Sequence, residues 1–478
     1  MDLAHGYRRA AHQVRQAPCA GDVQRHAASA LPRRADDEGA RLRHRVLLLD
    51  RALRAEGNAA RRAEGDRRRR ARGRPDVGLQ ERHRQGGDRD RVPRHGGLQE
   101  VLGQGVRGPR RGHPEDRQGR DKVIDGHGPS RFKVAGVRTD LHTHIVPPRW
   151  DDFASRFGGG KWPRLVVEDS ATSASRSATS ASRCRGTLMT GDQFFRAIDD
   201  RSWNPARRLE DMARLGIDRQ ALSPPPIMFC YWADAKANQA FARVQNDFIA
   251  SVASAHPDRF VGMATVPLQD VQLAIGELRH ARERLGLRAV EIGSCPAGRD
   301  FDDPELFPFF EACAGLDVAV FVHPAMPLAG QERLTKYYFP LIVGNPLENA
   351  LAISKLIFGG VLERLPALRI CFAHGGGAFP FTLGRLNHGW HVRPEGPAAI
   401  PKEPREYARR IWVDSLSHGE GNLRFIVDQL GADRVVIGSD YPFDMGFDDP
   451  AAALGASGLA PDVQARIAHD NAERFLNG

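Results

Sequence analysis

The chain has 478 residues, of which 41% are hydrophobic and 27% charged, with six cysteines and a net charge of +10. This balance is typical of globular proteins, and the longest apolar runs fall far short of the ~20 residues that cross a bilayer, so we expect no membrane span. The Arg-rich first 50 residues lack the apolar core of a secretory signal. Because no cysteines form a CxxC pair, we predict a cytoplasmic protein with reduced thiols.

The positive charge is concentrated near the N-terminus. Residues 1–130 contain 30 Lys and Arg against 18 Asp and Glu, a net of +12, while the remainder has 39 against 41, a net of −2. Tyr7 is the single aromatic residue before position 131. A segment so poor in large apolar side chains cannot offset the entropy of ordering a core. We therefore divide the chain into an Arg-rich low-complexity segment, residues 1–130, and a globular domain, residues 131–478.

Three interpretations of residues 1–130 stay open. Arg67–Arg70 and similar runs could contact phosphates and form a salt-sensitive nucleic-acid-binding arm. The segment could instead be a disordered tail, or a GC-rich reading frame translated upstream of the true start. We favour the last two, because aromatic stacking partners for nucleic acid are missing. Further along, the heptapeptide SATSASR occurs twice between residues 170 and 183, which predicts a flexible surface loop.

From Lys133 onward, short apolar runs alternate with amphipathic stretches. The predicted strands are Val137–Leu141, Arg219–Leu222, Phe260–Thr265, Arg288–Ile292, Asp317–Val322, Leu368–Phe372, Arg410–Val413 and Arg434–Ile437. The predicted helices are Pro205–Leu215, Asn238–Ala255, Asp270–Leu285, Glu305–Ala314, Leu347–Leu362, Asn422–Leu430 and Pro461–Leu476. Eight strands alternating with helices favour an α/β fold with a parallel sheet closed into a (β/α)₈ TIM barrel.

Histidines and one aspartate stand where four predicted strands end. His142 and His144 follow the first strand, His323 the fifth, His374 the sixth and Asp440 the eighth. Active sites of such barrels lie at these strand ends, and residues two apart on a strand point the same way. A structural histidine is the alternative for each residue alone, but the recurrence favours a shared metal ion. Imidazole and carboxylate without thiolate suit Zn²⁺, with Mn²⁺, Fe²⁺ and Co²⁺ as alternatives.

Four strings carry a resemblance to a known family: DLHTHIVPPRW, FVHP, CFAHGGGAFPFTLGRLNHGW and VIGSDYPFDMG. Together they resemble the amidohydrolase superfamily, in particular the branch of 2-amino-3-carboxymuconate-6-semialdehyde decarboxylases and related aromatic-acid decarboxylases. The resemblance runs from about Thr139 to Phe475. It implies one metal ion held by the catalytic Asp440 together with three histidines, and a second catalytic residue, His374, just outside these ligands. The three implied histidine ligands are His142, His144 and His323.

The resemblance also implies two substrate-binding arginines. Arg196 matches an arginine that holds a substrate carboxylate, and Arg393 matches one that reaches into the neighbouring subunit's site, which implies a homodimer. A surface charge is the alternative for each. The chain departs from the semialdehyde decarboxylases where Ala325 and Leu341 stand in place of two tryptophans, which puts that particular substrate in question.

The predicted function is metal-dependent, non-oxidative decarboxylation of a small unsaturated or aromatic carboxylic acid in aromatic catabolism. A hydrolase or hydratase on the same scaffold is the alternative, because the metal ligands alone do not separate these reactions. A nucleic-acid-binding protein that uses the basic segment is a third, less favoured hypothesis.

Several residues near the predicted site have open roles. Asp414 and His418 follow the seventh strand and either line the rim or make structural hydrogen bonds. Residues 375–377, three glycines, predict close packing of helix against strand rather than a phosphate cradle. Phe379, Phe381 and Phe443 either contact a planar substrate or, as is more common, belong to the core.

Overall fold

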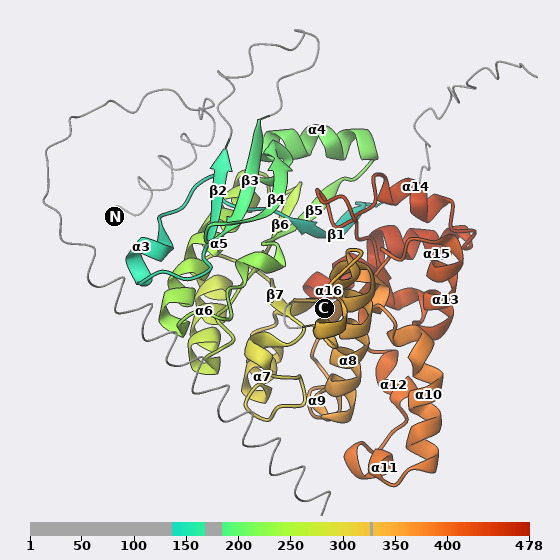
Figure 1. The fold of residues 1–478 in the computed structure, drawn as a ribbon. Coiled ribbons are helices and arrows are strands. Elements are labelled where there is room, and N and C mark those ends of the chain that lie inside the picture. The colour runs from blue at the N-terminus through green and yellow to red at the C-terminus, as the bar shows by residue number, and fades with distance from the viewer. Residues whose placement is uncertain (1–135, 168–183, 326–327) are drawn as a thin grey trace, which may run out of the picture. The chain divides into compact units, whose positions relative to one another are not determined.

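The computed structural model describes residues 136–167, 184–325 and 328–478 (Figure 1). The predictions for residues 1–130 and for the SATSASR repeat lie outside the described residues. The division of the chain at residue 130 therefore stays a prediction.

Eight parallel strands form one closed sheet. Each strand pairs with the next in chain order, and isolated parallel bridges from Asp140 to Ile437 and from Thr143 to Tyr441 join the last strand to the first. This arrangement confirms the predicted barrel, and all eight predicted strands are present with ends shifted by a few residues. The strands are β1 (Thr139–His144), β5 (Arg219–Ser223), β6 (Phe260–Ala264), β7 (Ala289–Gly293), β8 (Ala319–His323), β9 (Ile370–Phe372), β10 (Trp412–Asp414) and β11 (Val435–Val436).

Helices between the strands form the outer layer of the barrel (Figure 1). The first begins as its sequence predicts, because the Asn204 side chain accepts from the Ala206 N–H, Pro205 occupies the first turn, and Gly216 ends the helix in the left-handed conformation. The helices that match the predictions are α4 (Pro205–Leu215), α5 (Ala235–Ala255), α6 (Val271–Glu283), α7 (Phe307–Gly315) and α13 (Glu420–Leu430).

The predicted helix Leu347–Leu362 is two helices, α8 (Asn345–Phe358) and α9 (Val361–Arg364). The break lies at Gly359 and Gly360, where Gly360 has a φ of 69°. The predicted helix Pro461–Leu476 also contains two helices, α15 (Pro461–Ala465) and α16 (Asn471–Asn477), joined by a π-helical turn. Glycine's low helix propensity explains the first break.

Further helices were not predicted. After β9 come α10 (Phe379–Val392), α11 (Glu395–Ala399) and α12 (Pro404–Ala408), and after β11 comes α14 (Pro450–Gly455). Within α10 only Phe379, Pro380 and Leu383 are buried, and Gly384 and Gly389 lie in its interior. The helix therefore lacks the apolar periodicity on which helix prediction depends.

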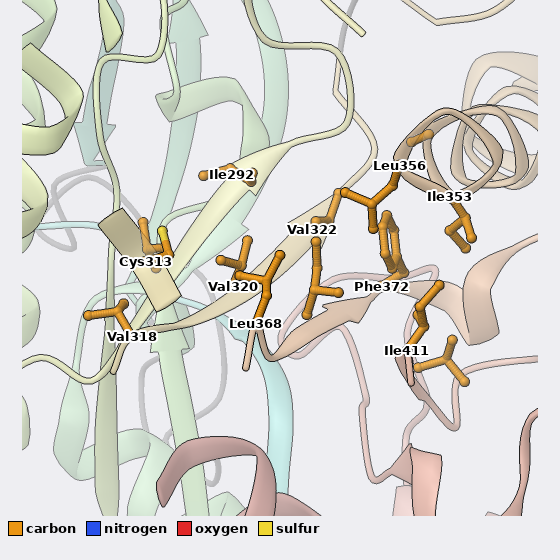
Figure 2. Close-up of a cluster of buried hydrophobic side chains, with 14 of the residues drawn as sticks. Ile292, Cys313, Val318, Val320, Val322, Ile353, Leu356, Leu368, Phe372 and Ile411 are labelled. Atoms are coloured by element: carbon orange, nitrogen blue, oxygen red, sulfur yellow. The ribbon is translucent and has the colours of Figure 1, made fainter. Parts of the chain in front are cut away.

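Two sets of apolar side chains pack on the two sides of the barrel wall. On the outer side, Val320 and Val322 of β8 and Phe372 of β9 pack with Ile353 and Leu356 of α8 (Figure 2). Inward-facing side chains form a second cluster with residues of α16. That cluster includes Ala289, Ala319, Phe321, Cys371, Trp412 and Phe475. Because Ala289, Ala319 and Trp412 begin their strands, apolar packing fills the N-terminal end of the barrel and leaves its C-terminal end to polar groups.

A small antiparallel sheet follows β1 and the short helix α3 (Phe153–Phe157). Its strands are β2 (Pro163–Val167), β3 (Arg185–Thr190) and β4 (Gln193–Asp199). The pairing of β3 with β4 shifts register between Leu188 and Met189, so Phe195 is an extra residue that bulges out of β4. The sheet was not predicted, because the repeat separates β2 from β3 in the sequence and β4 is mostly exposed.

The segment Pro340–Phe358, a π-helical turn (Pro340–Gly344) continued by α8, has the length and mean hydropathy of a membrane span. It is not an uninterrupted apolar run, because Glu348 and Lys355 lie within it, and the expectation of no membrane span stays a prediction. Glu348 is buried and accepts from Ser294 and from the Ala329 N–H. Ile353, Leu356 and Ile357 are buried against the barrel, whereas Leu347 and Leu351 are exposed, so the helix packs on the barrel with one face.

Candidate metal centre

Four barrel strands bring histidines and an aspartate to one point. His142 and His144 lie at the C-terminal end of β1, His323 ends β8, His374 lies in the turn after β9, and Asp440 follows β11. Their exposed fractions are 0% for His142, 1% for His144, 6% for His323 and 8% for Asp440. The His374 side chain is 16% exposed, so it is the most accessible of the four histidines.

The nitrogen and oxygen atoms of these side chains face one another. His142 Nε2 lies 3.2 Å from His144 Nε2, and His144 Nε2 lies 3.0 Å from Asp440 Oδ1. Candidate ligand atoms of His142, His323, His374 and Asp440 all lie within 4.8 Å of one another. This set includes His374 and omits His144, whereas the resemblance implied the reverse. The structure thus brings all five residues together, and the division into ligands and neighbour stays a prediction.

The cluster fits a divalent cation. His142 Nε2 and His144 Nε2 face each other at 3.2 Å. Two lone pairs at this distance repel each other, so the arrangement is stable only when a proton or a cation lies between or beside the two nitrogens. His144 Nδ1 and His374 Nδ1 are buried and have no hydrogen-bond partner among the described residues. Buried polar atoms are normally paired, so these orphaned groups indicate a missing partner. A set of imidazoles with one carboxylate is the donor set that Zn²⁺ and similar ions accept.

The electrostatics favour ligands that are ready to bind a cation. Burial lowers the pKa of His144 to about 4 and that of His323 well below its usual value, so both are neutral with lone pairs available. Burial opposes the charge of Asp440, but contacts with His144 and His374 outweigh it and hold the pKa of this carboxyl well below its usual range. Burial also opposes the charge of His142, but the hydrogen bond with Asp414 and the charges of Asp440 and Asp414 outweigh it and raise the pKa of this imidazole to about 9. The centre therefore contains an ionised carboxylate beside two neutral imidazoles, His144 and His323, and a cation that binds must displace a proton from His142.

Asp414, at the end of β10, orients two members of the cluster. Its Oδ2 lies 2.7 Å from His142 Nδ1 and accepts from the His374 N–H at 2.9 Å, and its Oδ1 accepts from the N–H groups of Gly375 and Leu416. Burial raises its pKa, but the hydrogen bond and charge of His142, the charge of His374 and the Gly375 N–H together lower it further, so the pKa lies below its usual value and the carboxylate stays ionised. Asp414 thus turns His142 Nε2 toward the centre.

Asp140 ties the first strand to the last. It accepts from the Ser439 N–H at 3.1 Å and from the Ser439 hydroxyl at 2.5 Å, and the Asp440 N–H donates to the His142 carbonyl oxygen at 2.9 Å. Asp440 itself has a φ of 59°, a backbone conformation that non-glycine residues rarely adopt. The closure of the barrel therefore places the carboxylate against the histidines of β1.

The glycines after His374 serve packing, as the sequence predicted. A Cβ at Gly377, where φ is 61°, would collide with the Pro346 carbonyl oxygen, and one at Gly375 would lie 2.7 Å from the Ile426 side chain. His374 also has a positive φ, 56°. This tight turn holds the His374 imidazole at the barrel mouth.

Arg196 lies at the edge of the centre. Its guanidinium stacks over the Phe443 ring, with Cζ 4.7 Å from the ring centroid, and the Phe443 ring lies 5.4 Å from that of His144. A cavity of about 820 Å³ is lined by Arg196, Tyr441, Phe443 and Asp444 among others, and by none of the five residues of the centre. The structure therefore brings Arg196 close enough to meet a substrate, although its role stays a prediction.

Arg393 lies away from the metal centre. It caps the C-terminus of α10, its side chain is 70% exposed, and its guanidinium lies 3.4 Å from the Glu395 carboxylate. A single chain therefore does not bring Arg393 to its own site. The predicted role concerns the site of a second subunit, and it stays a prediction.

Comparison with known proteins identifies the family. The sequence profile described as "Amidohydrolase" matches residues 139–478. The chain belongs to the amidohydrolase family. It is 43% identical over 311 residues to a 2-amino-3-carboxymuconate-6-semialdehyde decarboxylase from Dictyostelium discoideum, an alignment that covers 65% of this chain and 83% of that protein. It is also 30% identical to a gamma-resorcylate decarboxylase from Polaromonas sp. strain JS666, over 54% of this chain and 85% of that protein.

Among solved structures, the chain is similar to 5-carboxyvanillate decarboxylase from Sphingomonas paucimobilis. The TM-score is 0.53 and the identity 28%, over 56% of this chain and 82% of that chain. These relatives confirm the predicted family, the TIM-barrel fold and the predicted reaction class, decarboxylation. They do not favour the hydrolase or hydratase alternative.

The structure places several residues whose roles the sequence left open or did not reveal. Asp414 was recognised at its strand end, but hydrogen bonding and rim positions were not distinguished. Phe381 is 84% exposed, so a core position for it is wrong, whereas Phe379 is fully buried. Tyr338, whose hydroxyl contacts Arg196, was missed as a neighbour of Arg196 because nothing in sequence links it to β4.

Proposed function

We propose that this chain removes CO₂, without oxidation, from an unsaturated or aromatic carboxylic acid in the breakdown of aromatic compounds. The proposal depends on the joint placement of four imidazoles and a carboxylate at the barrel mouth. Arg196, which can bind a substrate carboxylate, lies at the edge of this cluster. The named relatives, which are decarboxylases, support it. A cytoplasmic location is part of the proposal.

The proposed ligands of a single ion are His142, His144, His323 and Asp440. Zn²⁺ is the proposed ion because imidazole and carboxylate ligands without thiolate suit it, and Mn²⁺, Fe²⁺ and Co²⁺ are the alternatives. When bound, such an ion supplies a Lewis acid at the barrel mouth. The protein's contribution is to turn the ligands toward the centre, which Asp414 does for His142.

His374 is proposed to move the proton. Decarboxylation breaks the bond from carbon to the carboxylate, the electron pair left behind passes into a conjugated carbonyl, enol or imine, and a proton replaces CO₂ on the carbon. His374 is the most exposed imidazole of the cluster, and its Nε2 lies 3.8 Å from Asp440 Oδ2. A proton at this nitrogen is therefore accessible from the barrel mouth and lies near a carboxylate that stabilises the charged imidazolium.

Arg196 is proposed to orient the substrate through a carboxylate. Its guanidinium offers paired N–H donors that match a carboxylate, and the Phe443 ring below it supports a planar substrate. Holding the acid in one orientation fixes the direction of the bond that breaks.

A homodimer is proposed because the surface near Arg393 is unusually apolar. Phe381 and Val392 of α10 are 84% and 57% exposed, and Leu347 and Leu351 of the adjacent α8 are 46% and 38% exposed. A second copy that covers these side chains would remove them from water and could receive Arg393.

The decisive test follows CO₂ release from candidate unsaturated and aromatic acids by the metal-loaded protein. His374→Ala is expected to lower kcat by a factor of about 10² to 10⁴ and to keep the metal, because it removes the proton donor and not a ligand. His144→Ala is expected to lose metal and activity together. Hydrated or ring-opened product without CO₂, or loss of metal from His374→Ala with retention in His144→Ala, would contradict these roles.

A further inference from the structure

Three separate segments meet at the Arg196 guanidinium. Nη1 donates to Asp444 Oδ1 at 3.2 Å, in the segment after β11, and Nη2 donates to the Tyr338 hydroxyl at 2.7 Å, in the segment before α8. The guanidinium face stacks on Phe443. Because the Phe443 ring also lies beside His144, a ligand that reaches Arg196 can extend over Phe443 to the metal centre.

The backbone at Tyr338 has an unfavourable conformation. Tyr337 and Tyr338 are consecutive and have φ values of 58° and 60°, in the left-handed region that side chains other than glycine rarely adopt. Tyr338 is 48% exposed, so burial of its ring does not explain the strain. Such conformations persist where they place a side chain for function. Here the turn delivers the phenol oxygen to Arg196.

The Tyr338 hydroxyl is free to donate a hydrogen bond. Its oxygen accepts from Arg196, and in the part of the chain that the structure describes, no acceptor for its own O–H is recorded. Asp444 is 78% exposed, so exchanging this carboxylate for another costs little desolvation. A carboxylate in its place would accept from Arg196 and from Tyr338 together.

We propose that Tyr338 is a specificity-determining residue, whose hydroxyl holds Arg196 and donates to the substrate carboxylate that displaces Asp444. The inference rests on the proposed function, since it requires Arg196 to bind the substrate. It selects acids over neutral analogues, because both donors favour an anionic oxygen. Asp444 is the internal competitor that keeps Arg196 paired until the acid arrives.

The test measures binding of isophthalate, an aromatic dicarboxylate, to the full-length metal-loaded protein by titration calorimetry. Tyr338→Phe is expected to weaken binding about tenfold, the loss of one hydrogen bond to a charged acceptor. The matched control Tyr337→Phe, altered at a neighbouring 75% exposed tyrosine, is expected to stay within about twofold of the wild type. Asp444→Asn is expected to bind more tightly. In an Arg196→Gln background, Tyr338→Phe is expected to have less than about twofold further effect.

Several outcomes would overturn the inference: Tyr338→Phe binding like the wild type, Tyr337→Phe weakening binding equally, Asp444→Asn weakening it, or no binding by the wild type. The thermal midpoint of Tyr338→Phe checks that the variant is folded. The reaction is tested separately by CO₂ release. Normal CO₂ release together with an unchanged affinity of Tyr338→Phe for isophthalate would contradict only the role of Tyr338. The expected binding pattern without CO₂ release would contradict only the proposed reaction.

Discussion

At the scale of single residues, the geometry of the metal centre depends on side chains that are not proposed metal ligands themselves. Asp414 contacts His142 Nδ1 and the backbone of His374, so one buried carboxylate sets two members of the cluster. The same logic applies to Asp140, which fixes Ser439 beside Asp440. Residues of this kind tune a metal site almost as strongly as its ligands do.

Asp414→Asn is expected to lower metal affinity by a factor of about 10 to 100, because the amide no longer matches the His142 imidazole as a charged acceptor. Competition with a chelator of known affinity measures this change. Asp428→Asn, on the exposed face of α13, is the control and is expected to leave metal affinity unchanged. Equal affinity of Asp414→Asn and wild type would show that Asp414 has no positioning role.

At the scale of elements, the turn after β9 is a tightly constrained connection to the centre. Four consecutive residues from His374 to Gly377 have positive φ, and the last packs directly against Pro346. Gly377 has ψ −128°, a combination that is essentially restricted to glycine.

Gly377→Ala is expected to lower the free energy of unfolding by about 3 kcal/mol, from backbone strain and the clash with Pro346. Gly276→Ala is the matched control, since a Cβ at this exposed position in α6 meets nothing within 4 Å. It is expected to raise the free energy of unfolding by about 0.5–1 kcal/mol. Urea denaturation measures both, and a Gly377→Ala protein as stable as the wild type would refute the packing argument.

The elements also show what a sequence can and cannot predict. The barrel strands were predictable because each is a short run of buried apolar residues. The cluster of histidines and Asp440 was predictable because the strand ends of a parallel barrel meet at one rim. The β2–β4 sheet and α10 lack such patterns, as their exposed faces carry Phe194 and Phe381. The contact of Tyr338 with Arg196 joins residues 142 positions apart. No local pattern encodes such a contact, because it depends on how two loops fold over the rim.

At the scale of the whole molecule, the apolar face of α8 and α10 predicts self-association. Phe381→Asp is expected to convert a dimer into a monomer in light scattering, and to reduce activity if Arg393 serves the partner's site. Phe425→Asp, at a 40% exposed phenylalanine of α13, is the control and is expected to remain dimeric. A monomeric wild type, or dissociation of both variants, would contradict a dimer built on this face.

Deletion of residues 1–130 is expected to leave kcat, KM and metal content unchanged, since every candidate site residue lies beyond position 130. Nucleic-acid retention at two salt concentrations measures the competing role of the segment. A steep salt dependence in the full chain that vanishes on truncation would restore the nucleic-acid interpretation. Loss of catalysis would show that the segment belongs to the enzyme.

The central claim is that imidazoles from separate barrel strands and Asp440 share one divalent ion. Elemental analysis of purified wild-type protein, of His142→Ala and of the control His256→Ala tests this claim most directly. We expect one divalent ion per chain in the wild type and the control, and less than about a tenth of that in His142→Ala. Metal-free but active wild type, or a His142→Ala variant that keeps its full metal content, would contradict the account.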